Sequence, residues 1–320
     1  MTRKHAGDNA FTAESLYGTI PEPMYAGALS FARRKYTRDL AGVDLAITGI
    51  PFDTATTNRP GARFGPRAIR AASVNLAWER HWPWDFDPFD RLAVVDYGDC
   101  LFDHGRPQGV PDAIERHVRT ILASGAGALT LGGDHFVTYP VLKAHAAKYG
   151  TLSLLHFDAH SDTWGDEDGR IDHGTMFYHA ARDGIVDPER SVQVGLRTTN
   201  DETLGFEVLD AHYVHAQAPA KTALEIREVI GDAPVYVTFD IDCLDPAFAP
   251  GTGTPVCGGL STAQALGILH GLSGLPVVGM DVMEVAPAYD VGEITALAAA
   301  TLAYELVCLV AVARGATNLE

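Results

Sequence analysis

Three short segments of the sequence gather carboxylate and imidazole side chains, the groups that bind metal ions and move protons. Each segment directly follows a short apolar run: Gly132-Gly133-Asp134-His135, Asp158-Ala159-His160-Ser161-Asp162 and Asp240-Ile241-Asp242. Residues i, i+2 and i+4 of an extended segment lie on one face. We therefore expect Asp158, His160 and Asp162 to converge, and Asp240 and Asp242 to join them from a second strand end. The two glycines of the first segment permit a close backbone approach that directs the histidine after them to the same place.

Four aspartates beside two histidines predict a site for two divalent cations. Like charges a few ångströms apart in a dry site cannot all stay ionised without compensating cations. A carboxylate has two oxygens, so Asp158 and Asp240 could each contact both ions. Oxygen and imidazole ligands without thiolate favour a hard or borderline metal such as Mn²⁺ over a structural zinc. A lone Asp-x-Asp pair more often caps a loop, and a lone histidine after two glycines is more often structural, but the three segments together favour the metal.

The elements that position these side chains alternate along the chain. Nearly continuous apolar runs, typical of strands covered on both faces, predict strands at Val43–Ile50, Leu92–Asp96, Ala128–Leu131, Leu152–Asp158, Ser191–Gly195, Ala211–His215, Pro234–Asp240 and Pro276–Val282. Helices are expected at Gly65–Ser73, Pro111–Ser124, Phe136–Tyr149, Ala220–Ile230, Thr262–Leu272 and Glu293–Ala313. This alternation predicts an α/β fold with three layers, α/β/α, around a largely parallel central sheet of roughly eight strands. Ligands of such sheets bind beyond the carboxyl ends of the strands, where the three segments lie.

Domain organisation is expected to be simple, because no linker, low-complexity stretch or internal repeat interrupts the pattern. Residues 41–320 are predicted to form one domain, and residues 1–40, with weak periodicity, an arm lying on the body or on a neighbouring subunit. Ile294–Ala313 is long enough to span a bilayer, but it is rich in weakly hydrophobic alanine and contains Glu305 near its centre. We interpret it as a helix buried in a large core.

Composition narrows the class of partner. The 320 residues are 47% hydrophobic, and 24 Lys and Arg against 41 Asp and Glu give a formal charge of −17. That sign argues against nucleic acid or an anionic membrane as the main partner, because both need a cationic face. The four cysteines are scattered without a Cys-x-x-Cys pair, which indicates a reducing compartment. The polar first eighteen residues contain no apolar signal-peptide region, and a cytoplasmic location is expected.

The motifs resemble those of the ureohydrolases, the family of arginases and agmatinases, over nearly the whole chain from Ile47–Asp53 to Glu293–Ala300. The three acidic segments, the last extended to Phe239–Pro246, are highly specific in combination. Further stretches are similar to the bacterial agmatinase branch in particular: Asn75–Glu79, Asp172–Phe177 and Val285–Asp290. The resemblance implies an arginase-like fold and an amidinohydrolase that acts on a linear amidine C–N bond and assembles as a trimer or hexamer.

The resemblance also implies roles for individual residues. Two Mn²⁺ ions per subunit are expected, one held by His135, Asp158, Asp162 and Asp240 and the other by Asp158, His160, Asp240 and Asp242. His173 matches the proton-shuttling histidine, Asp162 would carry a proton inside the site, and Glu284 matches the glutamate that receives the substrate guanidinium. Glu284 also directly follows an apolar run, where an active-site residue is expected. Without the motif around it, Glu284 would be interpreted as a surface carboxylate, and His173 as a solvated histidine in a polar loop. Trp164 and Thr254 are further candidate substrate contacts.

The implied reaction is attack on a guanidinium carbon by a hydroxide that bridges the two ions, because a metal lowers the pKa of bound water from about 15.7 to roughly 7. Arginases carry an asparagine where this chain has Trp164, which weakens an arginase assignment. The loop Gly165–Asp172 carries four acids against Arg170. An acidic rim suits the ammonium end of agmatine, so hydrolysis of agmatine to putrescine and urea is predicted, unless the loop is only a solvated charge run.

Three alternatives stay open. Arg170 keeps a guanidino-acid hydrolase possible, such as one acting on 4-guanidinobutyrate. A single-metal amidohydrolase related to the zinc-dependent deacetylases would share the general architecture and an Asp-x-His pair, but it lacks the full set of six ligands. A catalytically silent binding subunit is the third, and nothing in the sequence supports it, since every expected ligand position is occupied.

Overall fold

A nine-stranded parallel sheet forms the centre of the computed structural model, which describes residues 7–317 except 21, 79 and 166–167. The strands within these residues are β1 (Lys35–Tyr36), β2 (Leu45–Ile50), β3 (Val94–Asp99), β4 (Gly127–Gly132), β5 (Ser153–Phe157), β6 (Val192–Val194), β7 (Glu207–Leu209), β8 (Val235–Asp240) and β9 (Val277–Met283). Their order across the sheet is β1-β3-β2-β4-β9-β8-β5-β6-β7, and every pair is parallel. The site strands β4, β9, β8 and β5 are therefore consecutive neighbours.

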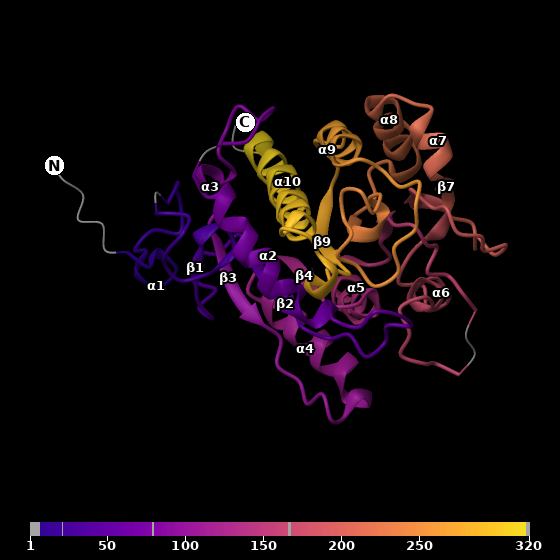
Figure 1. Cartoon of the computed structure of the whole chain (residues 1–320), viewed down its shortest axis with the longest axis horizontal. Helices are drawn as coiled ribbons and strands as arrows, with labels where there is room; N and C mark the ends of the chain where they lie inside the picture. The colour runs from indigo at the N-terminus through magenta and orange to yellow at the C-terminus, as the bar shows by residue number, and fades with distance from the viewer. Residues whose placement is uncertain (1–6, 21, 79, 166–167, 318–320) are drawn as a thin grey trace.

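Helices cover both faces of the sheet (Figure 1). One face carries α2 (Gly65–Ser73), α8 (Pro219–Ile230), α9 (Thr262–Gly271) and α10 (Ile294–Thr317), and the other carries α4 (Val110–Ala123), α5 (Thr138–Tyr149) and α6 (Met176–Arg182). The described residues also contain three short α-helices, α1 (Asn9–Thr12), α3 (Pro88–Arg91) and α7 (Ala211–His215), and several 3-10 turns. The predicted three-layer α/β/α architecture is confirmed.

The strands have apolar residues on both faces because each face meets a helical layer. In β2, Leu45 and Ile47 point into the core beneath α2 and α10, whereas Ala46 and Ile50 point into the core beneath α4 and α5. A strand buried on both faces shows a continuous apolar run instead of alternation. This is why the runs in the sequence located most of the strands.

One predicted strand is wrong. Ala211–His215 forms the short helix α7, and the neighbouring edge strand β7 lies immediately before it. Asp210 causes the change of structure, because its side chain accepts a hydrogen bond from the Tyr213 backbone N–H at 2.7 Å and so caps the helix. Side-chain caps of this kind favour a helix start over continued extension.

The apolar C-terminal helix α10 is mostly inside the protein. By length and composition Ile294–Arg314 could cross a membrane, but 72% of its apolar window is buried. The buried carboxylate of Glu305 has two partners, accepting hydrogen bonds from Trp84 Nε1 at 2.5 Å and His270 Nε2 at 3.0 Å. A buried acid with such partners is the arrangement that a core helix requires.

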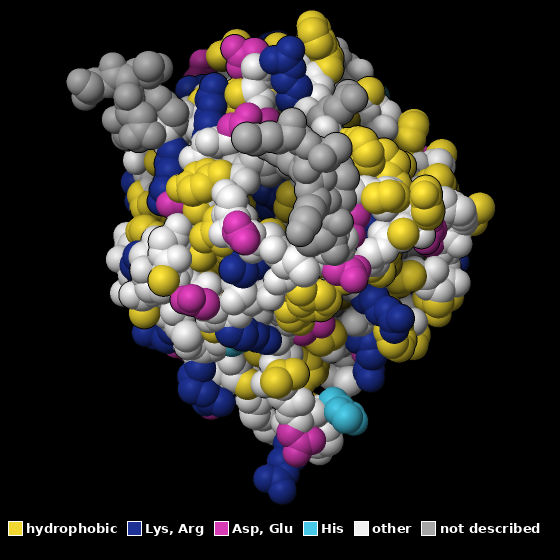
Figure 2. Space-filling view, turned by 90° about the vertical axis from the view of Figure 1, so that its left-hand side faces the viewer, with side chains coloured by type: hydrophobic (Ala, Val, Ile, Leu, Met, Phe, Trp, Pro, Cys, Tyr) yellow, Lys and Arg dark blue, Asp and Glu magenta, His cyan; other side chains and the backbone are white. Residues whose placement is uncertain are grey.

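The N-terminal side of the molecule carries exposed apolar side chains. Figure 2 views this side and shows hydrophobic groups between scattered basic and acidic ones. Residues 7–30 contribute several exposed hydrophobic residues: Phe11, Tyr17, Met24, Tyr25 and Leu29. Residues 35–36 then join the sheet as β1, which pairs with β3.

A buried ion pair connects α2 to the sheet. Arg70 donates to both carboxylate oxygens of Asp96, at 2.7 and 3.0 Å, and to Asp99 at 2.6 Å. Asp96 is completely buried and also accepts the backbone N–H groups of Phe31 and Gly98. Removal of the guanidinium would leave this carboxylate without its counter-charge in the core.

We therefore expect Arg70→Ala to lower the free energy of unfolding by about 3–5 kcal/mol. Arg119→Ala is the control, because the exposed Arg119 pairs with Glu115 on the surface of α4 and its loss should cost less than about 0.5 kcal/mol. Urea unfolding of both variants measures the difference. Equal losses would contradict the structural role of the buried pair.

Candidate functional site

The candidate site lies at the carboxyl ends of four adjacent strands. His135 begins the turn after β4, Asp158 follows β5, Asp240 ends β8 and Glu284 follows β9. Asp242 lies in the short 3-10 turn Ile241–Cys243 that continues from β8. Parallel strands present all their carboxyl ends at one edge of the sheet, so residues more than a hundred positions apart meet there.

Two glycines permit this approach at the end of β4. A Cβ atom on Gly133 would collide with the carbonyl oxygen of Phe52, and one on Gly132 would collide with the sulfur of Met283. The Gly133 carbonyl in turn accepts the Glu284 N–H at 2.9 Å. The expectation that these glycines direct His135 through close backbone approach agrees with this packing.

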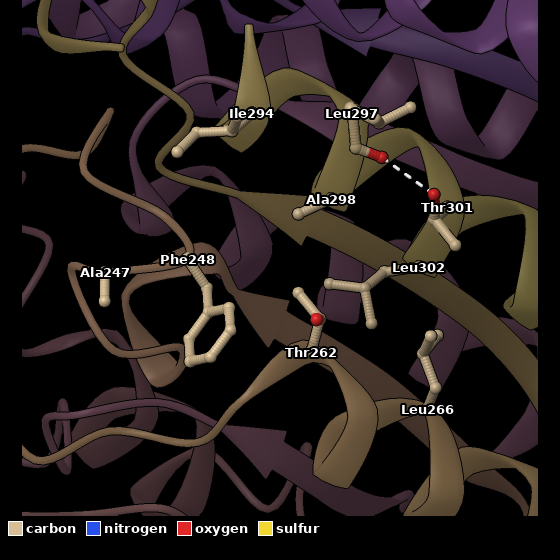
Figure 3. Close-up of a pocket in the computed structure, with 9 residues that line it drawn as sticks. All are labelled: Ala247, Phe248, Thr262, Leu266, Ile294, Leu297, Ala298, Thr301 and Leu302. Carbon is tan, nitrogen blue, oxygen red and sulfur yellow. Dashed lines mark hydrogen bonds between the residues drawn. The ribbon is translucent and has the colours of Figure 1, made fainter. Parts of the chain in front are cut away.

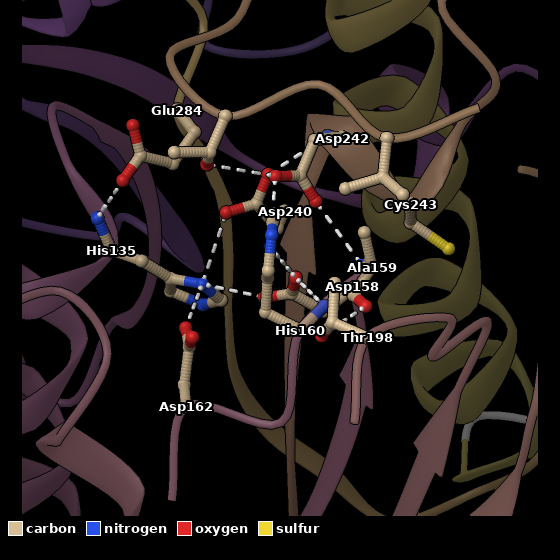
Figure 4. A network of polar contacts seen from close by, with 12 residues as sticks. His135, Asp158, Ala159, His160, Asp162, Thr198, Asp240, Asp242, Cys243 and Glu284 are labelled. Atoms are coloured by element: carbon tan, nitrogen blue, oxygen red, sulfur yellow. Dashed lines mark hydrogen bonds and ion pairs between the residues drawn. The ribbon is translucent and has the colours of Figure 1, made fainter. Parts of the chain in front are cut away.

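His135 faces three of the predicted carboxylates. Its Nδ1 lies 3.0 Å from Asp158 Oδ2, 3.1 Å from Asp162 Oδ2 and 3.2 Å from Asp240 Oδ2 (Figure 4). All four side chains are buried, and Nδ1 has no hydrogen-bond partner of adequate geometry. Three acceptor oxygens around one imidazole nitrogen are more than a single proton can satisfy.

His160 forms a second cluster that shares Asp158 with the first. Its Nδ1 lies 3.3 Å from Asp158 Oδ1 and 3.2 Å from Asp242 Oδ2. Asp158 therefore turns one oxygen toward His135 and the other toward His160 (Figure 4). Asp240 is held beside both clusters, because its Oδ1 accepts the Asp242 backbone N–H at 2.8 Å. The structure brings all six predicted ligand side chains together.

Asp162 reaches the cluster from a segment that is not an extended strand. The strand β5 ends at Phe157, and Asp162 has a left-handed backbone with φ 52°. Glu284 has φ 63° at the end of β9. A positive φ is uncommon for residues with a side chain, and strained backbone of this kind is found at many functional sites. The expected convergence of Asp162 occurs, but the expected extended segment through it is wrong.

Burial acts to raise the pKa of Asp158, but the histidines that face it hold that pKa well below its usual range. The other three aspartates of the cluster have raised pKa values. Burial, with the facing charges of Asp242 and Asp158, raises the pKa of Asp240 well above its usual range. Burial and the charge of Asp158 also raise the pKa of Asp162 and of Asp242. Burial alone would lower the pKa of His160, yet Asp158 and Asp242 raise it to about 12. The cluster therefore attracts positive charge strongly.

Glu284 and His173 lie next to the carboxylate cluster. Glu284 Oε1 accepts the His135 backbone N–H at 2.9 Å and lies 2.8 Å from His173 Nδ1. The Thr57 backbone N–H donates to His173 Nε2 at 3.0 Å, so the ring proton belongs on Nδ1, facing Glu284. Glu284 Oε2 is buried and has no hydrogen-bond partner. One carboxylate oxygen thus stays available to a bound cation.

A cavity of about 190 Å³ opens onto this cluster. Trp164 and Thr254 both line it, together with His160, Asp162, Asp172 and His173. Thr254 Oγ1 also donates to Asp242 Oδ2 at 3.2 Å, and Trp164 is half exposed. Of the acidic loop expected at its rim, Asp172 lies on the cavity wall and pairs with Arg170 at 2.7 Å. Asp166 and Glu167 lie outside the described residues.

Comparison with known proteins agrees with this geometry. A family model described as the arginase family matches residues 43–308. The chain belongs to the arginase family. It is 61% identical over 305 residues to an agmatinase from Chromobacterium violaceum, with 95% of each chain covered. The ureohydrolase resemblance seen in the motifs is thereby confirmed.

Solved structures give the same result for the fold. A hypothetical agmatinase from Burkholderia thailandensis is 59% identical, with a TM-score of 0.95 over 98% of this chain and 99% of that one. The proclavaminate amidino hydrolase from Streptomyces clavuligerus is 38% identical, with a TM-score of 0.86 over 91% of this chain and 100% of that one. Proteins named for different substrates therefore share this arginase-family fold.

Sequence reasoning missed several residues that contact the cluster in this arginase-family chain. His156 Nε2 lies 2.7 Å from Asp158 Oδ2, Thr238 Oγ1 lies 2.7 Å from His135 Nε2, and Thr57 holds His173. Asp281 is fully buried and accepts hydroxyl groups of Thr138, Tyr236 and Thr238. A lone acid inside the apolar run of β9, and a histidine two positions before Asp158 on the same strand face, were available signals. Thr57 gave none.

A second cavity, of about 350 Å³, has a different character. It lies between α9, α10 and the loop containing Phe248 (Figure 3). The side chains that line it are apolar apart from two threonines, Thr262 and Thr301, and Thr301 donates its hydroxyl to the Leu297 carbonyl. The side chains that line this groove include neither a titratable group nor a metal ligand.

Proposed function

We propose that this chain hydrolyses agmatine to putrescine and urea, using two Mn²⁺ ions per subunit. The observation that carries the proposal is the cluster of six predicted ligand side chains, five of them buried, beside Glu284, whose Oε2 has no hydrogen-bond partner. Such a cluster suits metal-assisted hydrolysis of a cationic substrate. The agmatinases at 55–61% identity support agmatine as that substrate.

The residues present fit a pair of divalent ions. His135 Nδ1 is buried without a hydrogen-bond partner among three carboxylate oxygens, where a shared cation would satisfy all four atoms. We propose His135, Asp158, Asp162 and Asp240 as ligands of one ion, and Asp158, His160, Asp240 and Asp242 as ligands of the other. An oxygen-rich set with one imidazole per ion and no thiolate supports manganese.

Bound ions of this kind supply hydroxide at neutral pH by lowering the pKa of coordinated water. The chain's own residues hold the substrate and move protons. Glu284 Oε2 accepts the guanidinium N–H groups and orients the planar group toward the cluster. Asp162, at the cavity wall, receives a proton from the attacking water, and His173, whose Nδ1 faces Glu284, delivers one to the leaving amine. Trp164 and Thr254 contact the rest of the substrate.

The cavity mouth supports agmatine over a guanidino acid. Asp172 on the wall presents a carboxylate, and its partner Arg170 is well exposed to solvent. A substrate ammonium would be attracted there and a substrate carboxylate repelled. The proclavaminate amidino hydrolase is the observation that keeps a guanidino-acid substrate as the second candidate. We further propose a cytoplasmic homo-oligomer, a trimer or hexamer, for this enzyme.

Substrate choice is the first test. With Mn²⁺-loaded protein, we expect urea release from agmatine to exceed that from 4-guanidinobutyrate and from arginine, because only agmatine ends in an unaccompanied ammonium. The ratio of kcat/KM values for the three compounds measures this choice. A clear preference for either acid would overturn the agmatine assignment, and absence of urea from all three would overturn the hydrolase.

Glu284→Gln should keep the metals and lose activity. The amide preserves the shape and the acceptor oxygen but removes the charge that pairs with the guanidinium, so kcat/KM for agmatine should fall about 100-fold, or roughly 3 kcal/mol. Manganese content, measured beside turnover, is the control and should match the unmodified protein. Near-normal turnover of the variant would exclude Glu284 as the guanidinium partner.

The two bridging aspartates should matter more than the terminal one. Asp158→Asn and Asp240→Asn remove charge from both proposed ion positions, whereas Asp242→Asn affects one. We expect the first two variants to lose affinity for both ions and the third to keep one Mn²⁺ per chain under the same conditions. Metal analysis after gel filtration measures this, and identical losses in all three variants would count against bridging.

A further inference from the structure

Three buried side chains form a row that begins at Gln193 on β6, passes through His156 on β5 and ends at Asp158, the carboxylate shared by the two clusters. Gln193 of β6 lies 3.0 Å (Nε2) from His156 Nδ1, and His156 Nε2 lies 2.7 Å from Asp158 Oδ2. All three residues are completely buried. We propose that His156 is a positioning residue that donates its Nε2 proton to Asp158 and is not itself a metal ligand. This inference rests on the proposed metal pair.

The orientation of the Gln193 amide determines which atom donates and which accepts in each hydrogen bond of the row. Gln193 Nε2 also lies 2.7 Å from the Ser161 carbonyl oxygen, which can only accept a hydrogen bond. The atom facing Ser161 is therefore the amide nitrogen, because the amide oxygen in its place would set two acceptors against each other. The second N–H of the same nitrogen points to His156 Nδ1, which must accept it.

The histidine tautomer follows from this contact. When Nδ1 of a neutral imidazole accepts, the ring proton is on Nε2, and Nε2 then donates to Asp158 Oδ2. The ring is locked in this orientation by an edge contact with Phe177, with centroids 4.5 Å apart, and by His135, with centroids 5.2 Å apart. A ring that is fully buried and clamped on two sides cannot turn to offer a lone pair.

The distances alone would suggest that His156 is a metal ligand. His135, His156, Asp158 and Asp162 each offer an atom within 4.8 Å of the others, which is compatible with four ligands around one ion. The lone pair that a ligand must present is absent from His156 Nε2, because that nitrogen carries the proton directed by Gln193. Histidines that hold a ligating carboxylate by a hydrogen bond tune a metal site from outside it.

The consequence for Asp158 is a defined division of its lone pairs. Oδ2 accepts from His156 Nε2, and Oδ1 accepts the His160 backbone N–H at 2.7 Å. Each oxygen of a carboxylate offers about two lone-pair positions, so one is left on each. The free position of Oδ2 faces the His135 cluster and that of Oδ1 faces the His160 cluster. The row thus fixes Asp158 as a bridge that presents one lone pair to each ion.

The first test is the tautomer in the unmodified protein. In protein labelled with ¹⁵N-histidine and freed of metal, side-chain ¹⁵N–¹H correlation spectra should show His156 with a protonated Nε2 and an unprotonated Nδ1. The His156 signals are assigned by their loss in His156→Phe. The same tautomer should persist after Mg²⁺ is added as a diamagnetic divalent ion. A proton on Nδ1, or loss of the Nε2 proton when Mg²⁺ binds, would overturn the proposal.

The second test separates a positioning residue from a ligand by metal affinity. His156→Phe should still bind two Mn²⁺ per chain at saturation, with affinity reduced about 10–100-fold, the usual effect of losing an outer hydrogen bond. His135→Phe removes a proposed ligand and should bind one ion fewer. His145→Phe, an equally buried imidazole that bonds the Val141 carbonyl, controls for packing and should leave Mn²⁺ affinity unchanged. Loss of one ion from His156→Phe would identify His156 as a ligand.

The third test asks whether Gln193 acts through His156. Gln193→Leu should weaken Mn²⁺ binding in the same direction but less, and the double variant should bind no more weakly than His156→Phe alone. Additive losses would show that Gln193 acts independently and would contradict the row. These readouts do not involve agmatine. A protein that passes them but releases no urea from guanidines disproves the proposed function and leaves this inference standing.

Discussion

The burial of four aspartates within a few ångströms of one another is the constraint on which the site depends. Their mutual repulsion in a poorly solvated place is unfavourable unless positive charge is supplied, and the raised pKa values of Asp162, Asp240 and Asp242 express this demand. Two imidazoles cannot meet it alone, because His135 Nδ1 already faces three oxygens. The fold therefore favours bound cations at this fixed position, and the chemistry proposed for this chain depends on those cations.

The sheet meets this constraint by making the site rigid. β4, β9, β8 and β5 are hydrogen-bonded neighbours with helices on both faces, so the backbone at their carboxyl ends has little freedom. The side chains there are restrained a second time, by the Thr238–Asp281 contact behind His135 and by the Gln193–His156 row behind Asp158. Restraint of this kind keeps like charges together before any cation arrives and preorganises them for binding.

Sequence alone predicted those parts of the molecule that follow from periodicity and charge. Continuous apolar runs located the central strands, and the acids directly after them located the cluster of carboxylates and imidazoles at the strand ends. It failed where one contact decides the local structure: Asp210 turns Ala211–His215 into a helix, and the left-handed backbone of Asp162 replaces the expected extension. Contacts between distant segments, such as Thr57 with His173, leave no pattern in either segment. Only the assembled fold reveals them.

The groups proposed to carry the reaction and those proposed to select the substrate lie in different parts of the chain. His135, Asp158, Asp240 and Glu284 lie at or close to the ends of central strands, where one residue cannot move without disturbing its neighbours. Trp164 and Asp172, by contrast, lie farther along the segment between β5 and α6, and they line the cavity together with other residues of that segment. A change in this loop can alter the charge at the cavity mouth while leaving the ion positions intact. Such a separation is consistent with the existence of arginase-family proteins that share one fold but are named for different substrates, agmatine and proclavaminate.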